Sequence, residues 1–262
     1  MEVKNIFSVS VVQTNLNWEN IELNLLKFDS LLEKINNKTD IVILPEMFTT
    51  GFSMNAEKFA EEENGRTLNW LMEKAGNLNA LIIGSIIIRE NSGYFNRLYT
   101  VFPDGSYKTY DKKHLFRIEG EADVYTPGNK RLIINYKGWK ISPFICYDLR
   151  FPVWSRNKNN YDLYINVANW PGSRRDIWIN LLKARAIENQ VYAIGVNRIG
   201  EDSNDTGHTG DSMIIDPKGK TLAQAEKNKE EIINTEISLS ELNDFRKKFP
   251  VGLDADNFEI IN

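Results

Sequence analysis

Three segments with the pattern of a strand are followed by side chains that could do chemistry, namely Glu46, the pair Lys112 and Lys113, and Cys146. In an open α/β sheet, ligands bind beyond the carboxyl ends of the strands, so residues at these positions converge on one rim. A carboxylate, an ammonium and a thiol on one rim form a set suited to nucleophilic acyl transfer. The three segments are 40–44, 107–111 and 139–145.

Each of these residues also has an ordinary structural interpretation. A lone cysteine is most often a small buried hydrophobe. A glutamate after a strand is usually solvated, and a lysine pair such as Lys112 and Lys113 usually forms a solvated charge. Their occurrence together on one rim, in a chain with 1 cysteine, favours the catalytic interpretation. A Cys–His dyad that uses His114 is an open alternative.

Alternating strands and helices must position these residues. After Asn17, a residue type that caps helices, apolar side chains recur at steps of three and four and predict a helix between residues 21 and 35. Continuous apolar runs predict strands buried on both faces, and Gly-containing turns predict hairpins. The pattern therefore predicts one α/β domain over residues 1–262, with a mixed sheet covered by helices. The expected strands span 3–12, 40–44, 80–89, 94–102, 107–112, 131–136, 139–145, 161–167, 190–198, 212–216, 221–226 and 231–236, and the other expected helices span 67–78, 152–157, 175–189 and 239–248.

The composition excludes several classes of protein. The chain has 262 residues and a formal net charge of −4, so it lacks the basic face that nucleic-acid binding requires. Its 1 cysteine permits no intramolecular disulfide and favours a reducing cytoplasm, and with only 2 histidines a zinc site is disfavoured. The apolar block 81–88 is far shorter than the ~20 residues that cross a bilayer, so we expect a cytoplasmic protein without membrane contact.

Three segments resemble the signature segments of the nitrilase, or carbon–nitrogen hydrolase, superfamily. They are Leu44-Pro45-Glu46-Met47-Phe48, Lys112-Lys113-His114-Leu115-Phe116 and Cys146-Tyr147-Asp148-Leu149-Arg150-Phe151-Pro152. Their order and spacing agree with the family, as do the flanks 168–171 and 184–189, and the stretch 47–54 is most similar to the omega-amidase branch. The resemblance implies a four-layer α-β-β-α sandwich with mixed sheets, and a homodimer or larger homo-oligomer. The apolar tail 249–262 would suit a subunit interface.

The resemblance also implies a Glu-Lys-Cys triad of Glu46, Lys112 and Cys146, with Glu121 as a second glutamate. Strand alternation places Lys112 and Lys113 on opposite faces, so only one of them points inward. In the implied mechanism, Lys112 lowers the thiol pKa, Glu46 moves protons, and Lys112 with the backbone N–H of Tyr147 stabilises the oxyanion. No metal or organic cofactor is needed.

Omega-amidases act on the terminal amide of small 2-oxo-dicarboxylic monoamides such as 2-oxoglutaramate or 2-oxosuccinamate, so a small amide with a carboxylate is the expected substrate. A carboxylate favours an arginine partner, and we expect this to be Arg174 or Arg175 rather than Arg117 or Arg150. Aromatic side chains are expected to wall the pocket: Phe52, Phe116 and Trp170. A related N-carbamoyl-amine hydrolase, a deaminated-glutathione amidase and a catalytically silent scaffold remain alternatives.

Overall fold

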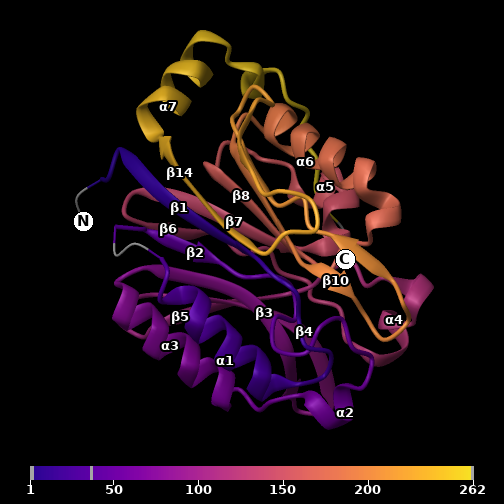
Figure 1. The fold of residues 1–262 in the computed structure, drawn as a ribbon. Helices are drawn as coiled ribbons and strands as arrows, with labels where there is room; N and C mark the ends of the chain where they lie inside the picture. The colour runs from indigo at the N-terminus through magenta and orange to yellow at the C-terminus, as the bar shows by residue number, and fades with distance from the viewer. Residues whose placement is uncertain (1–2, 36–37, 261–262) are drawn as a thin grey trace.

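Two six-stranded sheets lie face to face, and a helical layer covers the outer side of each (Figure 1). The computed structural model describes residues 3–35 and 38–260. The inner faces of the two sheets share one large apolar core, which contains Phe7 and Val9 from one sheet and Trp139 and Ile165 from the other. The predicted four-layer α-β-β-α sandwich is therefore confirmed.

The first sheet has the order β14-β1-β2-β3-β4-β5. Its centre is parallel, because β2 pairs in parallel with both β1 and β3, and its margins are antiparallel. All three residues of β2 are buried, as a strand covered on both faces requires. The strands are β1 (Ile6–Gln13), β2 (Ile41–Ile43), β3 (Leu81–Glu90), β4 (Gly93–Val101), β5 (Tyr107–Asp111) and β14 (Glu231–Ser238).

The second sheet has the order β13-β12-β9-β8-β7-β6 and repeats this plan, with a parallel centre of β7, β8 and β9. The hairpins β6–β7 and β12–β13 supply its antiparallel margins, so both sheets are mixed, as the hairpin signals predicted. Its strands are β6 (Ile134–Tyr136), β7 (Trp139–Ile145), β8 (Leu163–Ala168), β9 (Tyr192–Asn197), β12 (Met213–Ile215) and β13 (Thr221–Gln224).

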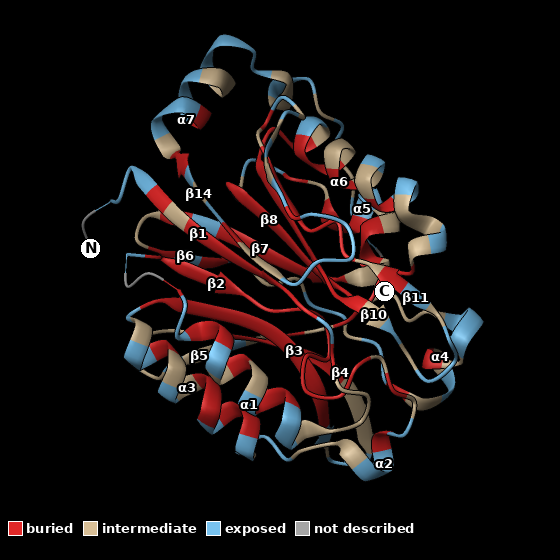
Figure 2. Ribbon diagram, viewed as in Figure 1, coloured by how far each residue is buried: buried red, intermediate tan, exposed pale blue. Residues whose placement is uncertain are grey.

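The helices cover the sheets with their apolar faces, as the buried inner and exposed outer surfaces in Figure 2 show. Helices α1 (Ile21–Leu32) and α3 (Arg66–Leu78) pack on the first sheet. Helix α6 (Arg175–Asn189) packs on the second through Trp178 and Leu182. Helix α7 (Leu239–Lys248) follows β14, and α5 (Pro152–Ser155) follows the Cys146 segment.

The N-terminus of α1 differs from the prediction. Asn20, rather than Asn17, caps the helix, since its side chain accepts a hydrogen bond from the N–H of Leu23. Asn17 instead contacts Asn24, whose Oδ1 accepts the Asn17 backbone N–H at 2.7 Å. Both asparagines are chemically able to cap, so the tertiary contact with Asn24 decides which of them does.

Several short elements were not predicted. They are too short to show a hydrophobic periodicity. Most of them lie in the segments that follow strands, whereas η4 follows α7. These elements are α2 (Ala56–Phe59), α4 (Glu121–Val124), the strands β10 (Ile199–Glu201) and β11 (Gly207–Thr209), and the 3₁₀ turns η1 (Arg117–Glu119), η2 (Cys146–Arg150), η3 (Gly172–Arg174) and η4 (Val251–Leu253).

The tail after α7 returns to the surface near α5. The Lys158 ammonium donates to the carbonyl of Phe258 at 2.5 Å and lies 4.4 Å from the centre of its ring. Phe249 and Leu253 remain exposed, so a subunit interface at 249–262 stays a prediction, and residues 261–262 lie outside the described part. In the described residues, no helix is long and apolar enough to cross a membrane.

Gly195 of β9 lets α6 approach the sheet. A Cβ there would lie 2.2 Å from Leu182 Cδ1 and 2.7 Å from Trp178 Cζ2. We expect Gly195→Ala to lower the free energy of unfolding by about 1–3 kcal/mol, the usual cost of overpacking a core. The matched control is Gly207→Ala, whose Cβ would meet nothing within 4 Å. Urea unfolding of the two variants checks this, and equal stabilities would contradict it.

Candidate active site

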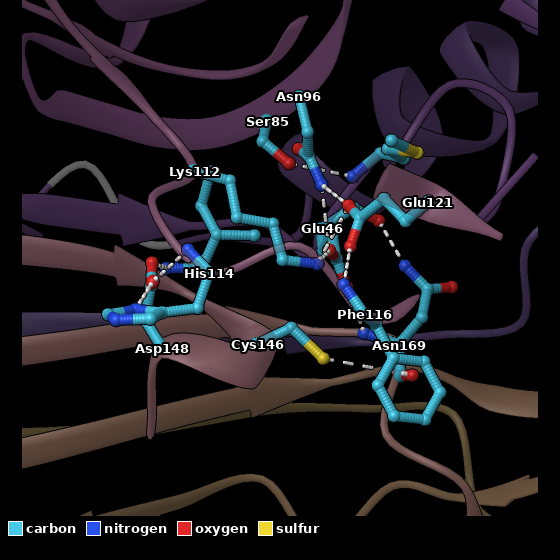
Figure 3. Close-up of polar contacts among 12 residues, drawn as sticks. Glu46, Ser85, Asn96, Lys112, His114, Phe116, Glu121, Cys146, Asp148 and Asn169 are labelled. Atoms are coloured by element: carbon cyan, nitrogen blue, oxygen red, sulfur yellow. Dashed lines mark hydrogen bonds and ion pairs between the residues drawn. The ribbon is translucent and has the colours of Figure 1, made fainter. Parts of the chain in front are cut away.

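Residues that follow strands of both sheets meet at one end of the sandwich (Figure 3). The first sheet supplies Glu46, beyond β2, and Lys112, directly after β5. The second supplies Cys146, the first residue after β7, and Asn169, the first after β8. The site therefore depends on the packing of one sheet against the other, and the predicted convergence on one rim is what the structure contains.

The Lys112 ammonium lies between two buried carboxyl groups. Its Nζ is 2.9 Å from Glu46 Oε1 and 2.9 Å from Glu121 Oε1. The three side chains are 1%, 0% and 0% exposed. Asn96 of β4 donates from Nδ2 to Glu46 Oε1 at 2.8 Å and to Glu121 Oε1 at 3.3 Å. One cation and one amide thus hold two carboxyl groups that would otherwise repel each other.

The register of β5 selects Lys112 rather than Lys113. The Lys112 backbone N–H donates to the carbonyl of Asn96 at 3.0 Å, which continues the β4–β5 ladder and places the two side chains together. Lys113 points the other way, where its ammonium lies 5.3 Å from the centre of a Trp154 ring. The expectation that only Lys112 faces inward agrees with this geometry.

Backbone groups fix the remaining carboxylate oxygens. The Asn169 N–H donates to Glu46 Oε2 at 2.8 Å, and the Asn169 side chain donates to the Glu46 carbonyl at 2.6 Å. The Phe116 N–H donates to Glu121 Oε2 at 2.6 Å. Ser85 accepts the Met47 N–H at 2.9 Å, which holds the segment that carries Glu46. Both glutamates are thereby locked in position.

Cys146 sits at a sharp bend between β7 and η2. Its φ of +42° lies in the left-handed region, which costs a non-glycine residue of order 1–3 kcal/mol and is found mainly at functional sites. Asp148 braces the bend, since its carboxylate accepts from Tyr110 Oη at 2.7 Å and from the N–H of Ile145 at 3.1 Å. The Cys146 Sγ is 4.0 Å from the carbonyl oxygen of Asn169.

The charges around Cys146 correct one expectation. Burial raises the pKa of the thiol well above its usual range, and the neighbouring Glu46 and Glu121 raise it further, while Lys112 lowers it. Burial alone would lower the Lys112 pKa, but Glu121 and Glu46 raise it overall. Lys112 therefore lowers the thiol pKa without bringing it below its free value, because burial and the two carboxyl groups outweigh its effect.

A cavity of about 310 Å³ opens onto Cys146 and Lys112. Of the residues predicted to form the substrate pocket, Phe52, Phe116, Trp170 and Arg174 line it, as does Tyr147. Arg150 also lines it, with its guanidinium 5.4 Å from the centre of a Trp170 ring. The other lining residues are Ile118, Glu119, Asn169, Pro171, Asp202 and His208.

Arg175 does not lie where the sequence analysis placed it. Its guanidinium forms two hydrogen bonds with Asp211, at 2.8 and 2.7 Å, and it does not line the cavity. We therefore withdraw it as a substrate-binding residue. Arg117 lines a separate surface pocket.

His114 is also used elsewhere. Its Nδ1 is 2.7 Å from Asp148 Oδ1, and its ring stacks on Phe151 at 3.8 Å between centres. The imidazole braces the bend that carries Cys146, so the structure does not support the Cys–His dyad.

The sequence analysis missed four polar residues that hold the site together. Asn96 and Ser85 lie within strands β4 and β3, and the local pattern does not show that Asn96 faces two carboxyl groups or that Ser85 accepts the Met47 N–H. Asn169 and Asp148 fall inside the quoted segments, but their roles depend on contacts with residues more than 20 positions away. Within residues 3–35 and 38–260, no group of three or more His, Cys, Asp or Glu side chains is arranged to hold a metal ion.

An α-β-β-α sandwich with a buried acid, a lysine and a cysteine at one end is the arrangement that the nitrilase resemblance implied. The chain matches the carbon–nitrogen hydrolase family over residues 8–247 and belongs to that family. It is accordingly a hydrolase that acts on amides.

Individual relatives agree with the omega-amidase branch. The chain is 45% identical to omega-amidase YafV of Escherichia coli K12, over 96% of this chain and 98% of the relative. It is 35% identical to a 2-oxoglutaramate amidase of Bacillus subtilis, over 94% and 96%. The structure superposes on XC1258 of Xanthomonas campestris, a CN-hydrolase superfamily protein, with a TM-score of 0.96 and 41% identity over 98% and 100% of the two chains.

Removal of the Lys112 charge tests the geometry of the site without any substrate. We expect Lys112→Met to lower the free energy of unfolding by about 3–5 kcal/mol, because Glu46 and Glu121 would remain buried without a cation. Burial raises the pKa of Glu121, and its protonation removes one of the two buried negative charges, so the loss should shrink as the pH falls below 7. Chemical denaturation at several pH values measures it.

The matched control is Lys113→Met. It removes a partly exposed ammonium from the face of Trp154, so we expect a loss of about 1 kcal/mol or less. If Lys113→Met were the more damaging variant, the assignment of the inward-facing lysine would be wrong.

Proposed function

We propose that this protein is an omega-amidase, which hydrolyses the terminal amide of a small 2-oxo-dicarboxylic monoamide such as 2-oxoglutaramate through a thioester on Cys146. The observation that carries the proposal is a single cavity that holds the Cys146 thiol, the Lys112 ammonium and the Arg150 guanidinium. The first two serve the reaction at the amide, and the guanidinium suits a carboxylate at the other end of the substrate. The similarity to omega-amidase YafV supports this substrate class.

Glu46 is the proton carrier of the proposed mechanism. Because the pKa of Cys146 is raised, the resting nucleophile is a neutral thiol. As Sγ attacks the amide carbon, its proton passes to Glu46 and then to the leaving nitrogen, so ammonia departs and a thioester forms. In the second half, Glu46 takes a proton from water, the hydroxide cleaves the thioester, and the proton returns to Sγ.

Lys112 and the Tyr147 backbone N–H are the proposed oxyanion donors. Lys112 lines the cavity beside Cys146 with its ammonium held rigidly by two carboxyl groups. The Tyr147 amide lies in the first turn of η2, where leading N–H groups have no acceptor within the helix. Donors fixed in advance stabilise the developing negative charge without reorganisation.

Arg150 is the proposed partner of the substrate carboxylate. Among the described residues no acidic side chain forms an ion pair with Arg150, and the Trp170 ring supports its guanidinium. Arg174 lies in the same cavity but is 3.8 Å from Glu119. This replaces the expected choice between Arg174 and Arg175.

The activity itself is tested by ammonia release from 2-oxoglutaramate. We expect turnover by the wild type and none above background by Cys146→Ala, because the covalent step requires the thiol. Removal of one sulfur atom beside a cavity should leave the unfolding free energy nearly unchanged. Activity within tenfold of the wild type in Cys146→Ala would refute the thioester mechanism.

The carboxylate preference is tested by comparing kcat/KM for succinamate and butyramide. We expect a preference for succinamate of roughly 10³-fold, because a neutral amide leaves the Arg150 charge unpaired. Arg150→Gln should remove most of this preference, mainly through KM, while leaving butyramide unaffected. Arg117→Gln, which lies outside the cavity, is the matched control. Equal values for the two amides in the wild type would refute a carboxylate-bearing substrate.

We infer further that the enzyme works in the cytoplasm as a homo-oligomer. The proposed catalytic thiol stays reduced in the cytoplasm, and a chain with 1 cysteine forms no intramolecular disulfide. Apolar side chains on α5 and α6 are exposed, with Val153 at 56% and Ile187 at 52%, and support burial against a second subunit.

A further inference from the structure

The two guanidinium groups of the cavity have different surroundings. Arg150 lies on Trp170 and faces no acidic ion-pair partner among the described residues. Arg174 comes from η3, stacks 5.1 Å from the centre of the Phe116 ring, and has its Nη2 3.8 Å from Glu119 Oε1. One arginine is therefore available to a ligand, and the other is already neutralised.

Glu119 lies on the wall of the cavity together with a second carboxylate, Asp202. Asp202 is near enough to raise the pKa of Glu119, yet no ion pair joins it to Arg174 in the described structure. His208, on the same wall, contributes no positive charge at neutral pH, because burial lowers its pKa to about 4 and Arg198 lowers it as well. This wall is therefore acidic apart from Arg174.

We propose that Glu119 is a specificity-determining residue, whose carboxylate occupies Arg174 and excludes amides that carry a second carboxylate. The inference rests on the proposed function and assigns to Glu119 the restriction of its substrates to amides with one carboxylate. The single carboxylate binds Arg150. A second one would face Glu119 and Asp202 with no unpaired cation to receive it, and such like-charge contacts are an effective way to reject a wrong ligand.

The pH dependence follows from the groups around Glu119. Burial raises the pKa of Glu119, and Asp202 and Glu46 raise it further, against the lowering effect of Arg174 and Lys112. Its carboxylate therefore takes up a proton at a higher pH than an exposed glutamate does. As the pH falls, exclusion of the second carboxylate should weaken in the wild type. The charged or titratable groups of the neighbouring elements that face it or share its cavity are Arg174, Asp202, Glu46, Lys112, Arg150, His208, Cys146 and Tyr147.

The test measures kcat/KM for ammonia release from three amides at neutral pH. The first is succinamate, and the second is succinamate with an additional carboxylate on the carbon that bears the first. The third carries a methyl ester in place of the additional carboxylate, which adds the bulk without the charge. We expect the wild type to favour the first over the second, and Glu119→Gln to narrow this preference by on the order of tenfold, since partly exposed charges are screened.

Two further variants isolate the contact between Glu119 and Arg174. Asp202→Asn also removes one negative charge from this wall. It should reduce the preference for succinamate over the amide with two carboxylates less than Glu119→Gln does. When Arg174→Gln is already present, Glu119→Gln should no longer increase kcat/KM for the amide with two carboxylates by as much. In that background there is no Arg174 guanidinium for the second carboxylate to bind. In Glu119→Gln, kcat/KM for the methyl ester relative to succinamate should not change. The preference for succinamate over the amide with two carboxylates should also depend less on pH in that variant than in the wild type.

An unchanged preference in Glu119→Gln would overturn the inference, as would an equal effect of Asp202→Asn. An equal increase in kcat/KM for the methyl ester in Glu119→Gln would also overturn the inference, because Glu119 would then exclude substrates by its bulk rather than by its charge. These results leave the turnover of succinamate by the wild type intact. Absence of that turnover would instead refute the proposed function.

Discussion

The contact of one buried ammonium with two buried carboxyl groups is the interaction on which the site depends. Lys112 lies 2.9 Å from both Glu46 and Glu121 in a region closed to solvent. An ion pair removed from water is maintained only where further hydrogen bonds satisfy the charged atoms. Asn96 and the backbone N–H groups of Asn169 and Phe116 supply those bonds here. The surrounding loops are therefore shaped by the need to satisfy these three charges.

This requirement links the two sheets. Glu46 and Lys112 extend from the first sheet, whereas Cys146 and Asn169 extend from the second. The two hydrogen bonds between Asn169 and Glu46 join the sheets beside Cys146, the proposed nucleophile. Shear between the sheets would separate the thiol from Glu46, its proposed proton acceptor. The shared apolar core thus serves the chemistry as well as the stability of the fold, since it sets the distance between acid and thiol.

Long elements with a strong period could be predicted from the sequence, and short elements around the site could not. Helices α6 and α7 begin and end where the pattern placed them, at 175–189 and 239–248. Their amphipathic faces extend over several turns, so local pattern and tertiary packing agree. Turns η1 and η3 contain three residues each, and their conformation depends on contacts such as Arg174 with Phe116 that no local pattern encodes. The motifs led to the residues that meet at the site, but Arg150 and Arg175 could be told apart only once the position of Asp211 was known.

The charge balance among Lys112, Glu46 and Glu121 also explains why Cys146, the proposed nucleophile, need not be a thiolate at rest. Burial disfavours a thiolate, which would also be a third negative group around one ammonium, and the raised pKa of Cys146 reflects both effects. If the proton leaves only as Sγ bonds to carbon, the new negative charge appears on the substrate oxygen instead. Lys112 can then stabilise it at a distance from Glu46 and Glu121. A lysine balanced by two carboxyl groups is thus a weak activator of the resting thiol, yet it is suited to a charge that forms only in the transition state.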